Sequence, residues 1–225
     1  MAGTMSNAEL IYEFFHGPRP PLPLGESASW IVMVWAAIGF VMGSLPIAVV
    51  LARVFAHRDP RSVGDHNPGS ANAWHVAGPV VGMLAVLLEG TKGFAPVALA
   101  CWCQGVTGWA VVPVMIAPVL GHMFSPFLAG RGGRGIAVTF GVWMGLTIWR
   151  VPVVFGILLC LLVLVVHLQD AWTVAAAWFL VLIYLTWSYP SPPVLAAGVI
   201  NYGLLIMRHH ADLHRPVFRR PRPTR

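Results

Sequence analysis

Charged side chains are scarce in this sequence. Asp, Glu, Lys and Arg make up 10% of its 225 residues, whereas a soluble domain of this size carries about 25%. A water-facing surface cannot be assembled from that composition. Hydrophobic residues account for 57%, and they fall into several runs close to the ~20 residues that cross a bilayer. The composition therefore excludes an ordinary soluble domain and indicates one transmembrane domain.

Cysteine is also rare. The three cysteines, Cys101, Cys103 and Cys160, lie in or beside apolar runs. Their odd number and their spacing are typical of neither a disulfide framework nor a metal site. We interpret them as packing residues, since a free cysteine behaves as a small hydrophobic side chain.

Acidic residues are fewer than basic ones, with 8 Asp and Glu against 14 Lys and Arg and a formal net charge of +6. No basic run is interleaved with aromatic residues, so a nucleic-acid partner is not expected. The Lys and Arg stand instead at the ends of apolar segments. Anionic lipid headgroups and a phosphate-bearing substrate are the better partners for such a pattern.

Seven apolar runs predict an all-α, polytopic membrane protein with about seven transmembrane helices. The first run contains Gly43-Ser44-Leu45-Pro46, where a helix would kink. We expect a flexible N-terminal tail at 1–29, a seven-span domain at 30–208 and a basic cytoplasmic tail at 209–225. The predicted spans cover about residues 30–55, 76–101, 109–128, 136–148, 151–166, 172–187 and 194–207.

Basic residues are distributed unevenly about these spans. With seven spans, the loops after the first, third, fifth and seventh share one side, and that side carries eleven of the fourteen Lys and Arg residues. Cytoplasmic loops are enriched in Lys and Arg. The sequence therefore predicts a cytoplasmic C-terminus and an external N-terminus.

Three polar segments fall on the predicted cytoplasmic side, at residues 61–72, 130–135 and 208–212. They are far apart in sequence, but the topology brings them to one surface. The first two are rich in glycine and precede apolar helices, so backbone N–H groups and a helix N-terminus can face an anion. Arg131 or Arg134 would add charge-assisted donors. A basic loop that only touches lipid headgroups is the alternative.

Two charged residues interrupt the second apolar run. Glu89 and Lys92 are three residues apart and share one face of a helix. A charge left in lipid costs at least ~2.5 kcal/mol, so both side chains should face the interior of the bundle. They form either a structural ion pair between helices or a site in which Lys92 reaches toward the cytoplasmic pocket.

Seven of the nine histidines also fall at or near the cytoplasmic side. His210 and His214 are four residues apart, a spacing seen in metal sites. A single histidine at an interface more often only forms hydrogen bonds, so we assign no metal ion. His209 differs from the others because it ends a span beside the other two polar segments.

These motifs resemble a known family, the PlsY-type acyl-phosphate:glycerol-3-phosphate acyltransferases, which are seven-span enzymes of the bacterial inner membrane. The resemblance implies transfer of an acyl chain from acyl phosphate to the 1-hydroxyl of glycerol 3-phosphate at the cytoplasmic face. No CoA donor and no cofactor is expected. The resemblance covers, in order and spacing, Gly43 to Pro46, Asp59 to Asn72, Glu89 to Gly93, Gly121 to Gly135, and Arg208-His209.

This sequence departs from the family at several reacting positions. The family's first loop typically reads Gly-Ser-Gly-Asn-x-Gly-Ala-Thr-Asn-x-x-Arg. Here Asp65 stands at its catalytic serine and His75 at its phosphate-binding arginine. A carboxylate cannot donate the hydrogen bond of a serine hydroxyl. His209 matches the family's catalytic histidine, Asp212 replaces an asparagine, and arginines replace the lysines of the second glycine-rich segment, which keeps its positive charge.

The resemblance and the polar segments together define an expected site. His209 and Asp65 are expected at the reacting centre, and acyl phosphate, glycerol 3-phosphate or a similar acceptor, and membrane lipids are the expected partners. The residues expected to bind the substrate and its phosphate are Arg61, Asn67, Gly69, Ser70, Asn72, His75, Lys92, His122, Gly132, Gly133, Arg134, Gly135 and Asp212.

Two alternatives remain open at this point. In the first, Asp65, His66, His75, His209 and Asp212 hold a divalent ion that bridges a phosphate. In the second, the chain keeps the pocket but serves as a non-catalytic lipid-binding or assembly subunit. A channel or transporter is disfavoured because no inverted-repeat pattern is visible.

Overall fold

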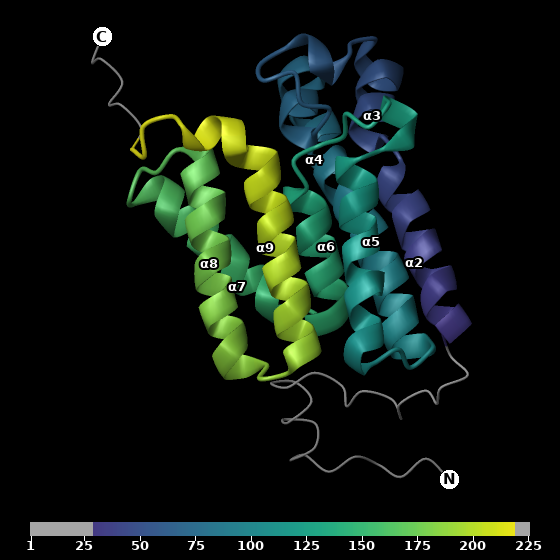
Figure 1. Cartoon of the computed structure of the whole chain (residues 1–225). Coiled ribbons are helices and arrows are strands. Elements are labelled where there is room, and N and C mark those ends of the chain that lie inside the picture. Colours follow the sequence, from purple (N-terminus) through teal and green to yellow (C-terminus); the bar gives the residue numbers. More distant parts are fainter. Residues whose placement is uncertain (1–28, 219–225) are drawn as a thin grey trace, which may run out of the picture.

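The computed structural model describes residues 29–218 of the chain, which fold as a bundle of helices (Figure 1). The predicted N-terminal tail, 1–29, lies outside these residues except for Ser29, and of the predicted basic tail, 209–225, residues 219–225 lie outside them. Within them the pairing between Leu168 and Phe218 is an isolated β-bridge, and no strand is formed. The longer helices are α2 Ser29–Ser44, α3 Ile47–Ala56, α4 Ser70–Ala98, α5 Val111–Met123, α6 Ile136–Thr147, α7 Arg150–Leu164, α8 Asp170–Ser188 and α9 Pro192–Leu213.

The first apolar run is broken into α2 and α3 at Leu45-Pro46, where the sequence predicts a kink. Proline has no N–H to donate to the preceding turn, and it disfavours helical geometry in the residue before it. The break leaves the Leu45 carbonyl and the Ala48 N–H outside the regular helical bonding pattern. Side chains of α4 occupy both groups, as described below.

The helix of the second apolar run, α4, contains a sharp turn that was not expected from the sequence. Gly78 has a φ of 83°, a left-handed conformation that favours glycine, and Pro79 follows it. A Cβ at Gly82 would overlap Trp74. The short helical segment at 70–77 therefore folds back against the segment that begins at Pro79, and α4 continues into a π-helical turn, Leu99–Cys103.

Two pairs of helices pack most extensively, α4 with α6 and α2 with α5. Their contacts depend on glycine because the backbones touch directly. A Cβ at Gly121 of α5 would overlap the Phe40 carbonyl of α2, and a Cβ at Gly141 of α6 would overlap the Gly90 carbonyl of α4. These close approaches hold α4, α5 and α6 in fixed positions around the polar end of the bundle.

The other half of the bundle packs around two buried tryptophans. The rings of Trp143 and Trp178 meet edge to face at 5.5 Å between centroids. Each indole N–H has a partner on α9: Trp143 donates to Asn201 Oδ1 at 2.9 Å, and Trp178 donates to the Gly198 carbonyl at 3.0 Å. These bonds tie α9 to α6 and α8 and fix the position of its polar end.

Four helical segments in the described part of the chain are long and apolar enough to cross a membrane. They are Ser29–Ala56, Ser70–Cys103, Gly108–Leu128 and Asp170–Ser188, and the shorter Ile136–Thr147 and Arg150–Leu164 are also apolar. Large hydrophobic side chains such as Trp187, which is 90% exposed, cover the outside of the bundle. In Figure 1 the loop after α3, the loop after α5 and the C-terminal end of α9 gather at one end.

Candidate functional site

A cavity of about 410 Å³ lies at the end of the bundle where the three polar segments meet. This volume is within the range of small-molecule sites. The first loop, the start of α6, the loop between α7 and α8, and the end of α9 all contribute to its wall. Of the residues expected from the sequence, those lining it are Asp65, Asn67, Gly69, Ser70, Asn72, His75, His122, Arg134, Gly135, His209 and Asp212.

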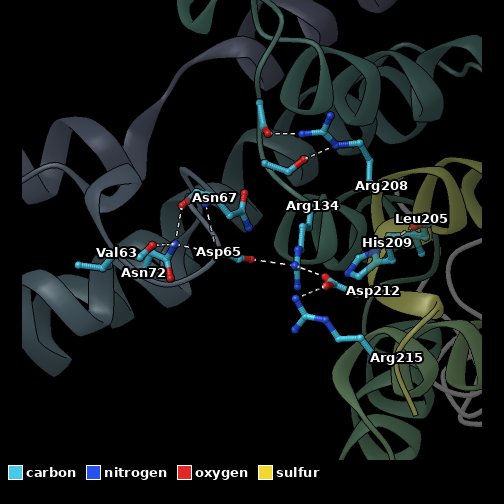
Figure 2. A network of polar contacts seen from close by, with 12 residues as sticks. Val63, Asp65, Asn67, Asn72, Arg134, Leu205, Arg208, His209, Asp212 and Arg215 are labelled. Carbon is cyan, nitrogen blue, oxygen red and sulfur yellow. Dashed lines mark hydrogen bonds and ion pairs between the residues drawn. The ribbon is translucent and has the colours of Figure 1, made fainter. Parts of the chain in front are cut away.

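The first loop is organised by the side chain of Asn72. Its amide Nδ2 donates to Asp65 Oδ1 at 2.8 Å, to the Asn67 carbonyl at 3.0 Å and to the Val63 carbonyl at 3.1 Å (Figure 2). Asp65 Oδ1 also accepts from the Asn67 N–H at 3.1 Å. These contacts fold the loop around the carboxylate that stands at the family's serine position.

Asp65 is a carboxylate at neutral pH. Partial burial raises its pKa, but the Asn67 N–H, the Arg134 guanidinium and the Asn72 amide outweigh that effect and hold the pKa below its ordinary value. Asp65 therefore acts here as a hydrogen-bond acceptor and a fixed negative charge.

Arg134 joins the first loop to α9. Its Nη2 lies 2.8 Å from Asp65 Oδ2 and also contacts Asp212 Oδ2. Arg215 contacts the other oxygen of the same carboxylate, Asp212 Oδ1, at 3.1 Å. Figure 2 shows Arg134 between the two carboxylates. The two acidic departures from the family pattern therefore share one arginine.

The second glycine-rich segment packs on the end of α5. The N–H of Gly132 donates to the Met123 carbonyl and that of Gly133 to the His122 carbonyl, each at 3.2 Å. A Cβ at either glycine would overlap His122. Arg208 donates from Nε to the Gly133 carbonyl at 3.2 Å and from Nη2 to the Gly132 carbonyl. The expectation that these two N–H groups face an anion is not met, because both bond within the protein.

His209 lines the cavity and is buried, with a relative exposure of 2%. Its Nδ1 lies 2.8 Å from the Leu205 carbonyl oxygen. A carbonyl oxygen only accepts, so Nδ1 carries the proton and Nε2 holds a lone pair. That Nε2 is buried and has no hydrogen-bond partner within the described residues. An unpartnered basic nitrogen at a cavity is suited to accept a proton from a bound hydroxyl.

Glu89 and Lys92 form the ion pair expected from their spacing. Lys92 Nζ lies 2.5 Å from Glu89 Oε2, and each side chain is 3% exposed. Lys92 donates to the freed Leu45 carbonyl at 2.8 Å, and Glu89 Oε1 accepts from the Ala48 N–H at 3.2 Å. His122 Nδ1 lies 3.0 Å from Glu89 Oε2. The pair therefore ties α4 to the broken first span.

Lys92 and three further expected residues do not line the main cavity. Lys92 and Gly133 lie instead at a much smaller cavity of about 10 Å³. Arg61 pairs with Asp59, with Nη2 at 2.8 Å from Oδ2. The hydrogen bonds that Arg61 donates to this carboxylate hold the pKa of Asp59 well below its usual range. Gly132 is covered by the end of α5.

Several cavity residues are not among those expected from the sequence. Gln169 precedes α8, Asp170 and Ala171 begin it, and the three form one wall, while Arg215 follows α9. Gln169 and Asp170 end the fifth apolar run on the predicted cytoplasmic side, which was a usable signal. No spacing in the sequence pointed to Arg215, because its position depends on how the segment after α9 folds.

The described residues do not assemble the ligand set of the metal-assisted alternative. Within 29–218, no three His, Cys, Asp or Glu side chains are placed to share an ion. Arg134 and Arg215 occupy the carboxylates of Asp65 and Asp212 that this alternative requires.

Comparisons with known proteins agree with the motifs. The family model for glycerol-3-phosphate acyltransferase matches residues 33–218. Glycerol-3-phosphate acyltransferase 1 of Thermotoga maritima is 32% identical over 193 residues, which cover 79% of this chain and 94% of that protein. The glycerol-3-phosphate acyltransferase of Nitratidesulfovibrio vulgaris is 36% identical over 132 residues, which cover 59% of this chain and 39% of that protein.

A solved structure is similar throughout the bundle. The crystal structure of PlsY, an integral membrane glycerol 3-phosphate acyltransferase in its glycerol 3-phosphate form, superposes with a TM-score of 0.76 at 25% sequence identity. The match covers 82% of this chain and 91% of that chain. The resemblance drawn from the motifs is thereby confirmed.

Proposed function

Since the chain belongs to the glycerol-3-phosphate acyltransferase family, we propose that it transfers an acyl chain from acyl phosphate to glycerol 3-phosphate or a closely related acceptor. The product is a monoacylated precursor of phospholipids. One observation carries the proposal: the cavity is lined by His209, whose buried Nε2 has a lone pair and no partner among the described residues.

The chemistry follows from that nitrogen. The acceptor hydroxyl gives its proton to His209 Nε2 as its oxygen attacks the acyl carbonyl carbon. A carbon–oxygen ester bond forms, and the bond between the acyl carbon and the phosphate oxygen breaks. Inorganic phosphate leaves with the electrons of that bond. The Leu205 carbonyl supports the step because its bond from Nδ1 orients the ring and stabilises the imidazolium as it forms.

Asp65 has a supporting role in this proposal. As a carboxylate it holds Arg134 and the first loop at the cavity, so it positions the site through these partners. A second candidate function rests on the same residue: with Asp65 and Asp212 both paired to Arg134, the chain could bind lipid without turnover.

A direct assay separates these two functions. Purified wild-type protein incubated with palmitoyl phosphate and glycerol 3-phosphate is expected to release phosphate and form lysophosphatidic acid, which mass spectrometry detects. We expect Asp65→Ser to retain activity, because a serine can still accept from the Asn67 N–H. Turnover that occurs only in Asp65→Ser would instead identify a relative that the carboxylate has disabled.

The location of the site also belongs to the proposal. We place the cavity on the cytoplasmic side of a bacterial plasma membrane, in a seven-span arrangement with the N-terminus outside, an N-terminal tail at 1–29 and a basic tail from 209. The positive-inside rule supports this orientation. Arg150 begins α7 at the opposite end, whereas the described arginines of the polar segments and neighbouring loops at the cavity end are Arg53, Arg58, Arg61, Arg131, Arg134, Arg208 and Arg215.

An apolar groove of about 290 Å³ between α4 and α6 is suited to the acyl chain. Its residues are apolar except for Thr91, and Ala137 lines both the groove and the polar cavity. A chain whose carbonyl lies near His209 could therefore extend past Ala137 into the groove. Gly90 forms part of the groove, and a Cβ there would make only an ordinary contact with the Ala137 carbonyl, at 3.7 Å.

Gly90→Leu is expected to shift the preference for acyl-chain length. The added side chain would occupy the groove, so kcat/KM for palmitoyl phosphate should fall about tenfold or more, while that for octanoyl phosphate changes little. Gly203→Leu is the matched control, because a Cβ at Gly203 on α9 meets open space. Equal losses for both chain lengths in Gly90→Leu would place the acyl chain elsewhere.

A further inference from the structure

Two cationic side chains among the described residues line the main cavity, Arg134 and Arg215. Arg134 lies between the carboxylates of Asp65 and Asp212 and contacts both. The positive charge of Arg134 is therefore shared between two carboxylates. A phosphate approaching Arg134 would also meet both carboxylates. Arg134 is therefore poorly suited to be the main anion-binding group of the cavity.

Two neighbouring cationic side chains, Arg208 and Lys92, already have partners within the protein. Arg208 donates from two of its nitrogens to the carbonyls of Gly132 and Gly133, which fixes the loop on α5. Lys92 is buried against Glu89 and the Leu45 carbonyl. Neither side chain lines the main cavity. A phosphate within the cavity must therefore pair with a different cationic side chain.

Arg215 has N–H donors that are not engaged by Asp212. Its side chain is 68% exposed, and its contact with a described carboxylate is the one to Asp212 Oδ1, at 3.1 Å. A guanidinium carries five N–H donors in a planar fork that can bind two phosphate oxygens at once. Figure 2 shows the Arg215 guanidinium beside Asp212 and next to Arg134. Most of its fork thus remains available at the rim of the cavity.

The backbone around Arg215 is held in place. We call residues 215–218 the C-terminal strap. The Arg215 carbonyl accepts from Trp172 Nε1 at 3.2 Å, and the Val217 carbonyl accepts from the Gln169 N–H at 2.9 Å. The bridge between Leu168 and Phe218 continues this pairing. The strap is thereby attached to the start of α8, which itself forms a wall of the cavity.

We propose that Arg215, presented by the C-terminal strap, binds the phosphate group of a substrate in the main cavity. The proposal rests on the acyltransferase function above and adds a binding residue to those expected from the sequence. Either the acceptor phosphate or the acyl phosphate has the required chemistry, a charged tetrahedral oxyanion. Besides pairing with Arg134, Asp212 then holds the Arg215 guanidinium at the rim of the cavity before the phosphate binds.

Steady-state kinetics on the full-length protein test the proposal. KM is measured for glycerol 3-phosphate at saturating acyl phosphate, and then with the two substrates exchanged. Arg215→Gln should raise one of the two KM values about tenfold to a hundredfold and lower kcat much less, since charge-assisted hydrogen bonds are lost. The substrate whose KM rises is the one bound. Arg215→Lys should restore part of the affinity, because it keeps the charge without the fork.

Two controls separate binding from structure. Arg58→Gln removes an exposed positive charge from the same end of the bundle and should leave both KM values unchanged. Trp172→Phe removes the indole donor that holds the strap but keeps the Arg215 charge. KM values for Arg215→Gln within twofold of wild type overturn the proposal, and so does an equal rise in Trp172→Phe without rescue by Arg215→Lys.

Absence of turnover in the wild type would contradict the acyltransferase function but would leave Arg215 open to test. Inorganic phosphate should then raise the unfolding temperature of the wild-type protein and of Arg58→Gln, and fail to raise that of Arg215→Gln. Equal stabilisation of all three proteins by phosphate would overturn the proposal for Arg215 by itself.

Discussion

Replacing His209 by alanine is expected to reduce acyl transfer by about a hundredfold to ten-thousandfold, the range attributed to a general base. The loss should appear in kcat, because His209 Nε2 receives its proton only as the acceptor oxygen attacks. KM values should change little, since the phosphate groups are bound by other side chains. The measurement is initial-rate release of phosphate from acyl phosphate in the presence of glycerol 3-phosphate.

The adjacent histidine provides a matched control. His210 has the same kind of internal bond, with Nδ1 2.7 Å from the Met207 carbonyl, but it is exposed and does not line the cavity. His210→Ala should therefore keep near wild-type rates. If His209→Ala retained a kcat within threefold of wild type, another group would have to be the base, and the proposed mechanism would be wrong.

Glu89→Gln is expected to cause the largest loss of stability. The change would leave the Lys92 ammonium buried with the Leu45 carbonyl as its main partner. Removing one member of a buried ion pair typically costs about 3–5 kcal/mol, because the other charge is left uncompensated. Equilibrium unfolding in mixed micelles, followed by tryptophan fluorescence, measures the free energy of unfolding.

A substitution on the same helix gives the reference for this measurement. Thr91→Val removes an exposed hydroxyl whose hydrogen bond goes to the Leu87 carbonyl, so its free energy of unfolding should lie within about 1 kcal/mol of wild type. A loss of similar size in Glu89→Gln would show that the pair contributes little. The link between α4 and the broken first span would then depend on packing alone.

Much of this architecture was readable in the sequence. Apolar runs indicated helices, and Leu45-Pro46 marked the break in the first one, because proline acts locally. The spacing of Glu89 and Lys92 predicted a pair facing the interior for a similarly local reason. The meeting of the three polar segments followed from counting spans. Each of these inferences depends on short-range rules or on topology alone.

Other features depend on contacts that no local rule specifies. The turn at Gly78 requires a positive φ, and glycine permits but does not dictate that conformation. The pairing of Arg134 with Asp65 and Asp212 joins positions 69 and 78 residues apart, and the identity of each partner became clear only in the fold. Arg215 reaches the cavity through the strap, whose attachment to α8 left no pattern in the sequence.

The broken first span and the charged second span have a consequence for biogenesis. Alone in hydrocarbon, α2 and α3 would expose the Ala48 N–H, and α4 would carry two charges that each cost about 2.5 kcal/mol or more. In the folded bundle, Glu89 accepts a hydrogen bond from the Ala48 N–H, and Lys92 donates one to the Leu45 carbonyl. Each segment thus provides hydrogen-bond partners for polar groups of the other. Release from the translocon into the bilayer is therefore most favourable when the two segments leave together as a helical hairpin. Their contacts through Glu89 and Lys92 would then form before the rest of the bundle is synthesised.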